Sequence, residues 1–315
     1  MPRTSNRARW ANLFKFVAHN ERNQQFHCKN AATERHDHAP LSHNWGSGNR
    51  RRVRTLSYVD AHIHLTDPGY IGKVEAVLDN AARNGITYLL SNAVDYGTSL
   101  HTISLAKRQA GHVLAAVGLH PWTVVNSGNS DQTKFEPLLD EHGQYVSAIG
   151  EIGLDGKYTQ DEEKTSLQKE TFRFFLRLAE KRRLPVVIHS RLALNDVLDE
   201  LSRFDLSRVL MHWYDGPTEK LKLIQDRGYV ITVGPSLLYS KRVAEVARTA
   251  DLEMILTETD GPVSYHGTFE GKMTQPSFVI DVVRALAELK SLNVETIRDA
   301  VSSNFQRFIM PGSNA

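Results

Sequence analysis

Short apolar runs alternate with amphipathic stretches along the chain from residue 58 onward. Most of the apolar runs are uninterrupted, as is typical of parallel strands covered on both faces. They predict strands at residues 58–64, 86–91, 113–118, 146–151, 185–189, 208–212, 229–233 and 254–259. A helical period between the runs predicts helices at 73–84, 99–109, 134–142, 164–183, 192–201, 218–227 and 241–250, followed by 277–289 and 294–305.

Eight strand–helix units within roughly 255 residues are typical of an α/β protein with a (β/α)₈ TIM barrel. Glycines follow several of the predicted helices, at Gly85, Gly111 and Gly228, where a helix end commonly needs a left-handed residue. We therefore predict that residues 58–315 form one barrel domain. An open doubly wound sheet is the structural alternative, but it would not explain where the polar residues lie.

The first 57 residues differ in composition from the rest of the chain. They contain eleven basic and three acidic residues, whereas the remainder contains 27 basic and 33 acidic residues. Their pattern has no sustained period, so we predict a basic, disordered N-terminal extension at 1–57. Apolar residues between Trp10 and Val17 favour a short amphipathic helix, which makes an organelle presequence the alternative to a cytoplasmic protein.

Composition excludes several classes of protein. No apolar run approaches the ~20 residues that a membrane-spanning helix needs, so we predict no membrane span. Cys28 is the single cysteine, which excludes an internal disulfide framework and any multi-cysteine metal site.

Polar side chains of metal-binding type stand where five of the predicted strands end. His62 and His64 alternate with apolar residues, so they point to the same side of the first strand. Other strands end at residues of the same type, namely Glu151, His189, His212 and Asp260. Because the carboxyl ends of barrel strands meet at one mouth, where the active site lies, we predict that the six side chains converge there.

The chemistry of these six side chains favours a divalent metal site. Each residue alone is more simply explained as a hydrogen-bonded residue of the core. Six such groups crowded together without a cation would cost several kcal/mol each in desolvation and repulsion. Four imidazoles and two carboxylates without cysteine suit Zn²⁺, Mn²⁺, Fe²⁺ or Mg²⁺.

The motifs that contain these residues resemble those of the TatD-like DNase family of metal-dependent hydrolases. The segments that carry the resemblance are 60–64 (Asp-Ala-His-Ile-His), 150–155 (Gly-Glu-Ile-Gly-Leu-Asp), 188–191 (Ile-His-Ser-Arg), 211–212 (Met-His) and 258–262 (Glu-Thr-Asp-Gly-Pro). Segments 118–122 and 303–308 look like two further signatures of that family. The resemblance covers about residues 58–310, and residues 1–57 have no counterpart in it.

The resemblance implies a two-metal hydrolase of the amidohydrolase type, with DNase activity in several members. Carried over by motif, the ligands of one ion would be His62, His64, Glu151 and Asp260. The ligands of the second ion would be Glu151, which bridges the two, together with His189 and His212. The expected cofactors are two divalent ions, Mg²⁺, Mn²⁺ or Zn²⁺. The bridging position holds Glu151, so the carboxylated lysine of many wider relatives is not needed.

Such a centre would catalyse hydrolysis, because two ions lower the pKa of a shared water and balance charge at a phosphoryl group. Asp260 is predicted to accept the proton of that water and to pass it to the leaving oxygen. His120 and Arg191 are predicted to bind phosphate, with a loop cap and a surface ion pair as their respective alternatives. Asp60 is expected either to orient a ligand imidazole or to help to bind metal.

The predicted substrate is DNA, degraded from the 3′ end of a single strand or a frayed end. Two segments depart from the family pattern: 213–216 reads Trp-Tyr-Asp-Gly, and the loop 263–276 contains one lysine and one glutamate where the family has a basic loop. This weakly basic loop keeps a small ester, amide or lactone as the alternative substrate. A catalytically idle scaffold is a third possibility. The residues that could stack unpaired bases are Trp122, Trp213, Tyr214 and Tyr265.

Overall fold

The computed structural model describes residues 57–158 and 161–310. The predicted extension at 1–57 therefore lies outside the described residues, apart from Ser57, and so does the choice between cytoplasm and organelle import that depends on it. In the part of the chain that is described, no helix is both long enough and apolar enough to cross a membrane.

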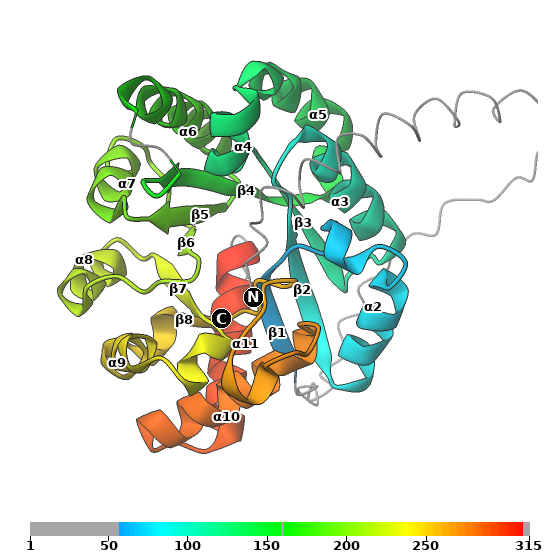
Figure 1. Ribbon diagram of the computed structural model, residues 1–315, viewed down its shortest axis with the longest axis vertical. Helices are drawn as coiled ribbons and strands as arrows, with labels where there is room; N and C mark the ends of the chain where they lie inside the picture. The colour runs from blue at the N-terminus through cyan, green and yellow to red at the C-terminus, as the bar shows by residue number, and fades with distance from the viewer. Residues whose placement is uncertain (1–56, 159–160, 311–315) are drawn as a thin grey trace, which may run out of the picture. The chain divides into compact units, whose positions relative to one another are not determined.

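Eight parallel strands follow one another around a barrel in sequence order, as predicted (Figure 1). Each strand pairs in parallel with the next one. The strands are β1 (Tyr58–Ile63), β2 (Ile86–Asn92), β3 (Val113–Val117), β4 (Val146–Asp155), β5 (Val186–Arg191), β6 (Val209–Met211), β7 (Val230–Val233) and β8 (Ile255–Thr257).

Helices form the outer layer around the strands (Figure 1). They are α2 (Val74–Arg83), α3 (Tyr96–Arg108), α4 (Pro121–Ser127), α5 (Phe135–His142), α6 (Glu162–Arg182), α7 (Leu194–Leu201), α8 (Leu221–Asp226), α9 (Lys241–Thr249), α10 (Val279–Lys290) and α11 (Val294–Ile309). Four differ clearly from the prediction. Helix α8 begins three residues later than expected, after a 3₁₀ turn at Thr218–Lys220, and α11 ends four residues later. Helix α3 begins three residues earlier than expected, because the Asp95 side chain and Thr98 cap it reciprocally. Helix α4 was not predicted, since its seven residues are too few to show a period.

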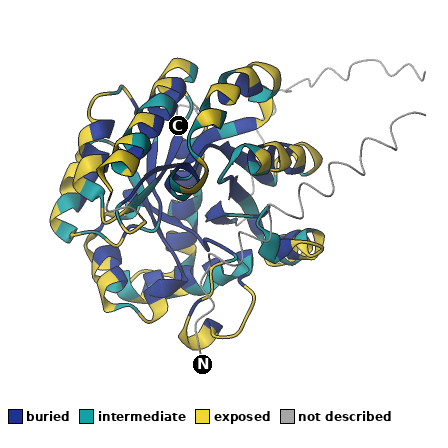
Figure 2. Ribbon diagram, turned by 45° about the horizontal axis from the view of Figure 1, so that its top comes forward, coloured by how far each residue is buried: buried dark blue, intermediate teal, exposed yellow. Residues whose placement is uncertain are grey.

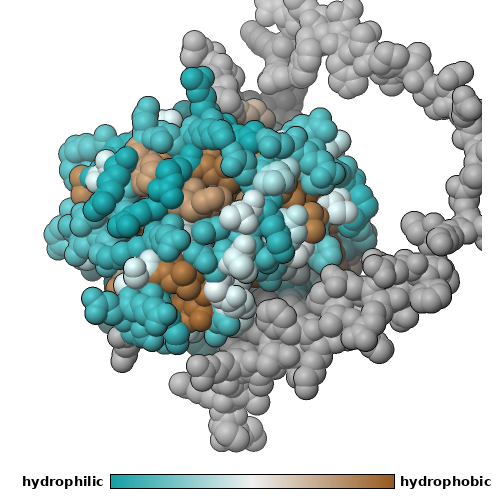
Figure 3. Space-filling model, turned by 90° about the horizontal axis from the view of Figure 1, so that it is seen from above, coloured by the Kyte–Doolittle hydropathy of each residue, from teal (hydrophilic) through white to brown (hydrophobic). Residues whose placement is uncertain are grey.

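The core consists of the strands and the inward faces of the helices, which are the buried positions in Figure 2. Aromatic rings fill the layer between α5, α6 and the barrel, where Phe135 and Phe175 are fully buried and meet edge to face at 4.9 Å. Burial of a side chain of this size stabilises a fold by about 1.5–3 kcal/mol. On the face seen in Figure 3, hydrophilic side chains surround separate apolar patches.

Hydrogen bonds between β1 and the segment that follows β8 close the barrel. The Asp260 N–H donates to the His62 carbonyl, and the His64 N–H donates to the Gly261 carbonyl, both at 2.8 Å. The Thr257 hydroxyl adds a hydrogen bond to the Val59 carbonyl at 2.6 Å. The closure brings the last predicted site residue next to the first two.

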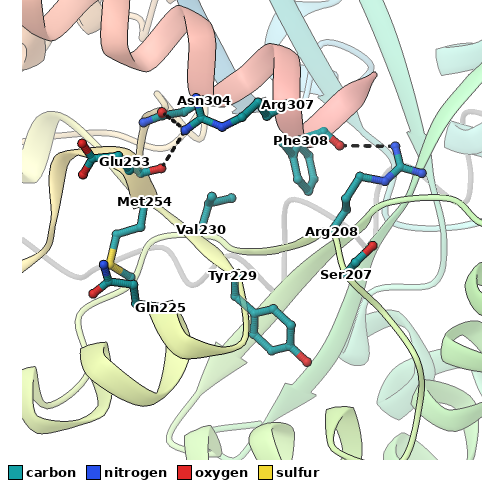
Figure 4. Close-up of a pocket in the computed structure, with 11 residues that line it drawn as sticks. Ser207, Arg208, Gln225, Tyr229, Val230, Glu253, Met254, Asn304, Arg307 and Phe308 are labelled. Carbon is teal, nitrogen blue, oxygen red and sulfur yellow. Dashed lines mark hydrogen bonds between the residues drawn. The ribbon is translucent and has the colours of Figure 1, made fainter. Parts of the chain in front are cut away.

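A cavity of about 350 Å³ lies at the end of the barrel where β6, β7 and β8 begin, beside the C-terminal part of α11 (Figure 4). Its two guanidinium groups bond to the protein itself: Arg208 donates to the Phe308 and Ile309 carbonyls, and Arg307 donates to the Asn304 side chain. None of the predicted site residues lines this cavity. Because barrel enzymes place their chemistry at the carboxyl ends of the strands, we attribute this end to stability.

Candidate metal centre

The six predicted ligands converge at the carboxyl ends of the strands. Strand β1 and the residue after it supply His62 and His64, β4 supplies Glu151, and β5 supplies His189. His212 and Asp260 come just after β6 and β8. All six are at least half-buried, and side-chain exposure is only 2% for Glu151, whose carboxylate lies between the histidines. The predicted convergence on one mouth is therefore what the fold produces.

One group of donor atoms gathers around Glu151 Oε2. His62 Nε2 lies 3.3 Å and His64 Nε2 lies 3.4 Å from this oxygen. The same two nitrogens lie 3.4 and 3.2 Å from Asp260 Oδ1, and 3.2 Å from each other. We call these four atoms the first group. It contains two imidazole nitrogens and two carboxylate oxygens.

A second group of donor atoms gathers around the other oxygen, Glu151 Oε1. His189 Nδ1 lies 2.8 Å and His212 Nε2 lies 2.9 Å from it. We call these three atoms the second group. His120 Nε2 lies beside this group, 3.4 Å from the same oxygen and 3.2 Å from His189 Nδ1. The two groups adjoin, because the rings of His62 and His212 stack with their centroids 3.9 Å apart.

The spacing of the first group fits a bound metal ion. Ligand atoms that surround Zn²⁺ tetrahedrally at about 2.1 Å are about 3.4 Å from one another. The five distances measured in the first group run from 3.2 to 3.4 Å, longer than most hydrogen bonds between such atoms. Nitrogen and oxygen donors without thiolate also suit the divalent ions predicted from the sequence. The residues present therefore fit a divalent metal.

Hydrogen bonds to the outer nitrogens indicate the tautomers of two of the histidines. His64 Nδ1 donates to the Asn92 carbonyl at 2.9 Å, so its Nε2 is free to bind a metal. His189 Nε2 lies 2.8 Å from Asp155 Oδ2, and His212 Nδ1 lies 3.5 Å from Glu258 Oε2. Asp155 accepts a hydrogen bond from His189 Nε2, which directs the inner nitrogen, Nδ1, toward the centre as a ligand atom. Glu258 lies beside His212 as an ion-pair partner, but His212 Nδ1 has no hydrogen-bond partner among the described residues.

Asp155 and Glu258 were assigned no role from the sequence, although a signal for them exists. Asp155 lies four residues after Glu151, and Glu258 lies two residues before Asp260. The even spacing within β4 favours Asp155 on the same side as Glu151, whereas Glu258 and Asp260 both follow the end of β8, where the strand period does not apply. The sequence thus places both carboxylates near the mouth, but it does not show which imidazole each one meets.

His120 has the opposite hydrogen-bond arrangement. It is the residue before α4, and its Nδ1 accepts a hydrogen bond from the Trp122 N–H at 3.0 Å. A neutral imidazole with an accepting Nδ1 carries its proton on Nε2. His120 therefore presents an N–H to the second group instead of a lone pair. His120 therefore caps the loop before α4, which was the predicted alternative, and also faces the centre. The loop-cap and phosphate-binding interpretations do not exclude each other.

The charges of the centre move pKa values in opposite directions. Burial alone would raise the pKa of Glu151, but the neighbouring imidazoles of His212, His120 and His62 hold it well below its usual range. Burial alone would lower the pKa of His64, but contacts with Asp260 and Glu151 raise it to about 10. Ionised carboxylates and protonated imidazoles thus stabilise each other, and a metal cation would take the place of the protons.

Asp60 does not orient an imidazole, which corrects one of the two roles predicted for it. Its carboxylate accepts hydrogen bonds from the Thr259 N–H at 2.9 Å and from the Thr259 hydroxyl at 2.5 Å, and its remaining contact is the backbone N–H of His62. Asp60 also lies outside the groups of side chains spaced to hold an ion in the described residues. Its carboxylate instead ties β1 to the segment after β8.

Arg191 and the aromatic candidates lie around the centre instead of within it. Arg191 is exposed, and its guanidinium lies over the Tyr158 ring, 5.7 Å from the centroid. Tyr214 and Tyr265 are buried, and their hydroxyls donate to the backbone carbonyls of Pro217 and Thr259, so they pack the loops. Trp122 and Trp213 are half-buried and remain candidates for stacking.

Two residues of the site have a left-handed backbone, which is uncommon for side chains other than glycine. Asp260 has φ 46° and Trp213 has φ 43°. Such conformations cost of order 1–3 kcal/mol and collect at functional sites. The Trp213 N–H donates to the Thr232 hydroxyl at 2.8 Å, which helps to hold the residue that follows His212.

Comparison with known proteins agrees with the geometry. A family model described as TatD related DNase matches residues 59–310. The uncharacterized metal-dependent hydrolase MJ1582 of Methanocaldococcus jannaschii is 29% identical over 256 residues, which cover 81% of this chain and 98% of that protein. The human deoxyribonuclease TATDN3 is 26% identical over 264 residues, which cover 80% and 94%.

Solved structures agree as well. The structure of YjjV, a TatD homolog from Escherichia coli, superposes with a TM-score of 0.75 at 27% identity, over 81% of this chain and 98% of that one. A phosphotriesterase homology protein from E. coli superposes with a TM-score of 0.60 at 17% identity, which shows the fold alone. Because the family model extends from the first strand to the last helix, this chain belongs to the TatD-related DNase family and is a metal-dependent hydrolase.

Proposed function

We propose that this protein is a deoxyribonuclease that uses two divalent ions, Mg²⁺, Mn²⁺ or Zn²⁺, to hydrolyse phosphodiester bonds from the 3′ end of single-stranded or frayed DNA. The observation that carries the proposal is that the two oxygens of Glu151 face two different groups of histidine nitrogens. A carboxylate in this position is suited to hold two cations side by side. The proposed ligands of the first ion are His62, His64, Glu151 and Asp260. Those of the second are Glu151, His189 and His212.

Asp260 and Glu151 have different roles in this proposal. Two divalent ions, when bound, lower the pKa of a water molecule and offset the charge of the phosphodiester. The Asp260 side chain is 12% exposed, and the adjacent imidazoles of His62 and His64 hold its pKa below the usual range despite burial, so it is ionised at neutral pH. We assign to it the transfer of the proton from the water to the leaving oxygen. Glu151, more deeply buried, holds the centre together.

His120 supplies a hydrogen-bond donor for the substrate. Its Nε2–H points at the second group, and burial lowers the pKa of His120, which keeps the imidazole neutral. A phosphate oxygen that enters beside Glu151 and His189 would accept this hydrogen bond. A fixed donor at such a position stabilises charge that develops during the reaction.

Features of the mouth support an unpaired strand as the substrate. Unpaired bases stack on aromatic side chains, and Trp122 and Trp213 are half-buried next to His120 and His212 in the sequence. Arg191, at the exposed end of β5, is proposed to bind a phosphate. One relative, the human TATDN3, is named a deoxyribonuclease.

A small ester, amide or lactone is the second candidate substrate, and the rim of the mouth favours it. Several loops that follow the strands expose large apolar side chains, including Leu192 at 83% and Ile71 at 63%. The loop 263–276 contributes only Lys272 as a cation. Duplex DNA would need more positive charge than this. The complete set of ligand-type side chains argues against an idle scaffold.

The test is degradation of single-stranded DNA labelled at its 5′ end, with the full-length protein and Mg²⁺, Mn²⁺ or Zn²⁺ in turn. Progressive shortening from the 3′ end supports the proposal. Asp260→Asn should abolish it, whereas Glu200→Gln, which changes a buried carboxylate on the outer helix α7, should not. Absence of DNA cleavage beside turnover of an ester or lactone would overturn the DNase proposal in favour of the second candidate.

A further inference from the structure

The two histidines of the second group each have a carboxylate on their outer side. Asp155 Oδ2 lies 2.8 Å from His189 Nε2, and Glu258 Oε2 lies 3.5 Å from His212 Nδ1. Both carboxylates are fully buried, at 0% exposure. They do not reach the donor atoms around Glu151 and act on them only through the imidazole rings.

Other hydrogen bonds hold these two carboxylates in place. The Lys157 N–H donates to Asp155 Oδ1 at 2.8 Å, and the Thr232 hydroxyl donates to Glu258 Oε2 at 2.5 Å. Among the ion pairs of the described residues, neither carboxylate meets a lysine or an arginine; each meets only its histidine. The two buried carboxyl groups therefore have no lysine or arginine beside them, and a buried carboxylate is costly unless a cation is near.

The first group is built differently. The outer nitrogen of His64 meets the backbone carbonyl of Asn92, and His62 Nδ1 has no hydrogen-bond partner among the described residues. That group instead contains a second carboxylate, Asp260, as a direct donor. The second group has only the shared Glu151 as a direct carboxylate, and its additional negative charge lies one imidazole further out.

We propose that Asp155 and Glu258 are positioning residues that determine the affinity of the second group for its metal ion. This inference rests on the two-metal centre of the proposed function. Asp155 fixes the tautomer and the ring orientation of His189 through a hydrogen bond, and Glu258 places a carboxylate 3.5 Å from the outer nitrogen of His212. Both would make the inner nitrogen of their histidine a stronger donor to the ion. Together they compensate for the second direct carboxylate, which the first group has in Asp260 and the second group lacks. His189 would coordinate through Nδ1, and His62, His64 and His212 would coordinate through Nε2, since these are the nitrogens that face Glu151.

Competition between the protein and a chromophoric chelator for Zn²⁺ tests this inference. The wild-type protein should bind two ions per chain. Asp155→Asn and Glu258→Gln should each weaken one of the two binding steps by about 10–100-fold and leave the other step unchanged. The control Glu200→Gln also replaces a buried carboxylate by its amide, but this carboxylate lies on the outer helix α7 and pairs with Arg173 instead of with a ligand histidine, so it should change neither step.

Long-range ¹H–¹⁵N spectra of the histidine rings identify which step is affected. In Asp155→Asn at limiting Zn²⁺, the rings of His62 and His64 should shift as bound, while His189 should stay unbound until excess metal is added. In the wild type, the coordinated nitrogen of His189 should be Nδ1. Circular dichroism of both variants shows whether they fold, and the two variants check each other because Asp155 ends β4 and Glu258 follows β8.

The outcomes separate this inference from the proposed function. Two unchanged binding steps in both folded variants would overturn the role of Asp155 and Glu258 and leave the DNase proposal standing. Coordination of His189 through Nε2 would overturn it as well. A third outcome is that the variants lose one binding step while the wild-type protein cleaves no DNA with any of the metals. That result would support the inference and overturn the DNase proposal.

Discussion

The backbone N–H of Asp260 donates a hydrogen bond to the carbonyl oxygen of His62 across 2.8 Å. The two residues come from opposite ends of the barrel sequence, yet their side chains also meet, with His62 Nε2 3.4 Å from Asp260 Oδ1. Closure of the barrel therefore assembles the first group of donor atoms. The same pair of residues closes the barrel and supplies two of the proposed ligands, so folding and metal binding should depend on each other.

Replacement of Asp260 by asparagine should lower the turnover of DNA by about 10²–10⁴-fold, because the amide cannot accept the proton from water. The backbone hydrogen bond to His62 remains in this variant, so the fold should persist. Steady-state rates at saturating metal, together with the metal content, check the prediction. Turnover within a few-fold of wild type would show that another group accepts the proton.

Replacement of His120 by alanine should lower turnover by about 10²–10³-fold, since a donor aimed at the substrate is lost. The number of bound metal ions should stay the same, because Nε2 of His120 carries a proton and is not a ligand. His120→Gln, which keeps an N–H donor, should recover part of the rate. Loss of one ion from His120→Ala would instead mean that this imidazole binds metal.

Binding of Zn²⁺ should release protons at pH 7. The pKa of His64 is raised to about 10 by Asp260 and Glu151, so the imidazole is protonated at pH 7, and a metal must displace that proton. The apparent affinity should accordingly rise with pH between 7 and 10. Calorimetry in two buffers of different ionisation enthalpy measures the release. Binding heats that are independent of the buffer would contradict it.

Replacement of Trp213 by alanine should raise the KM for single-stranded DNA by about 5–100-fold, the effect of one lost base–aromatic contact. Its ring stacks on Tyr265 with centroids 5.7 Å apart, which holds it in one orientation. Trp213→Phe should keep most of the affinity. An equal effect on a small ester would indicate that the substitution disturbs the adjacent His212 instead.

Replacement of Gly153 by alanine should destabilise the fold by at least about 2 kcal/mol. A Cβ atom at this position would lie 2.0 Å from the carbonyl oxygen of His189, and the backbone has φ 146°. Chemical denaturation measures the loss. Gly111→Ala is the informative comparison, because that glycine also has a positive φ but open space around its Cβ, so it should cost less.

Most of the fold could be predicted from the pattern of the sequence. Uninterrupted apolar runs mark the strands, since both faces of a barrel strand are covered, and the helical period marks the long helices. Helix α4 was not predicted, because seven residues are too few to show a helical period. The start of α3 was predicted too late, because it depends on the cap that Asp95 and Thr98 form together. Local hydrogen bonds, not hydrophobicity, decide such boundaries.

The sequence by itself determined which residues form the centre. The spacing of His62 and His64 places both on one side of a strand. Because the strands of a parallel barrel all end at the same mouth, Glu151 and Asp260 lie there as well. These inferences need only the period of a strand and the direction of the barrel. They do not require knowledge of which side chains touch.

Only the tertiary structure decided which nitrogen of each imidazole carries the proton and which one faces the centre. The tautomer of a histidine depends on what its outer nitrogen meets, and those partners come from elsewhere in the fold: Asp155 for His189, but the Trp122 N–H for His120. A sequence lists the same residue type at both positions. In the proposed centre, the hydrogen bond on the far side of each ring would make His189 a metal ligand and His120 a hydrogen-bond donor.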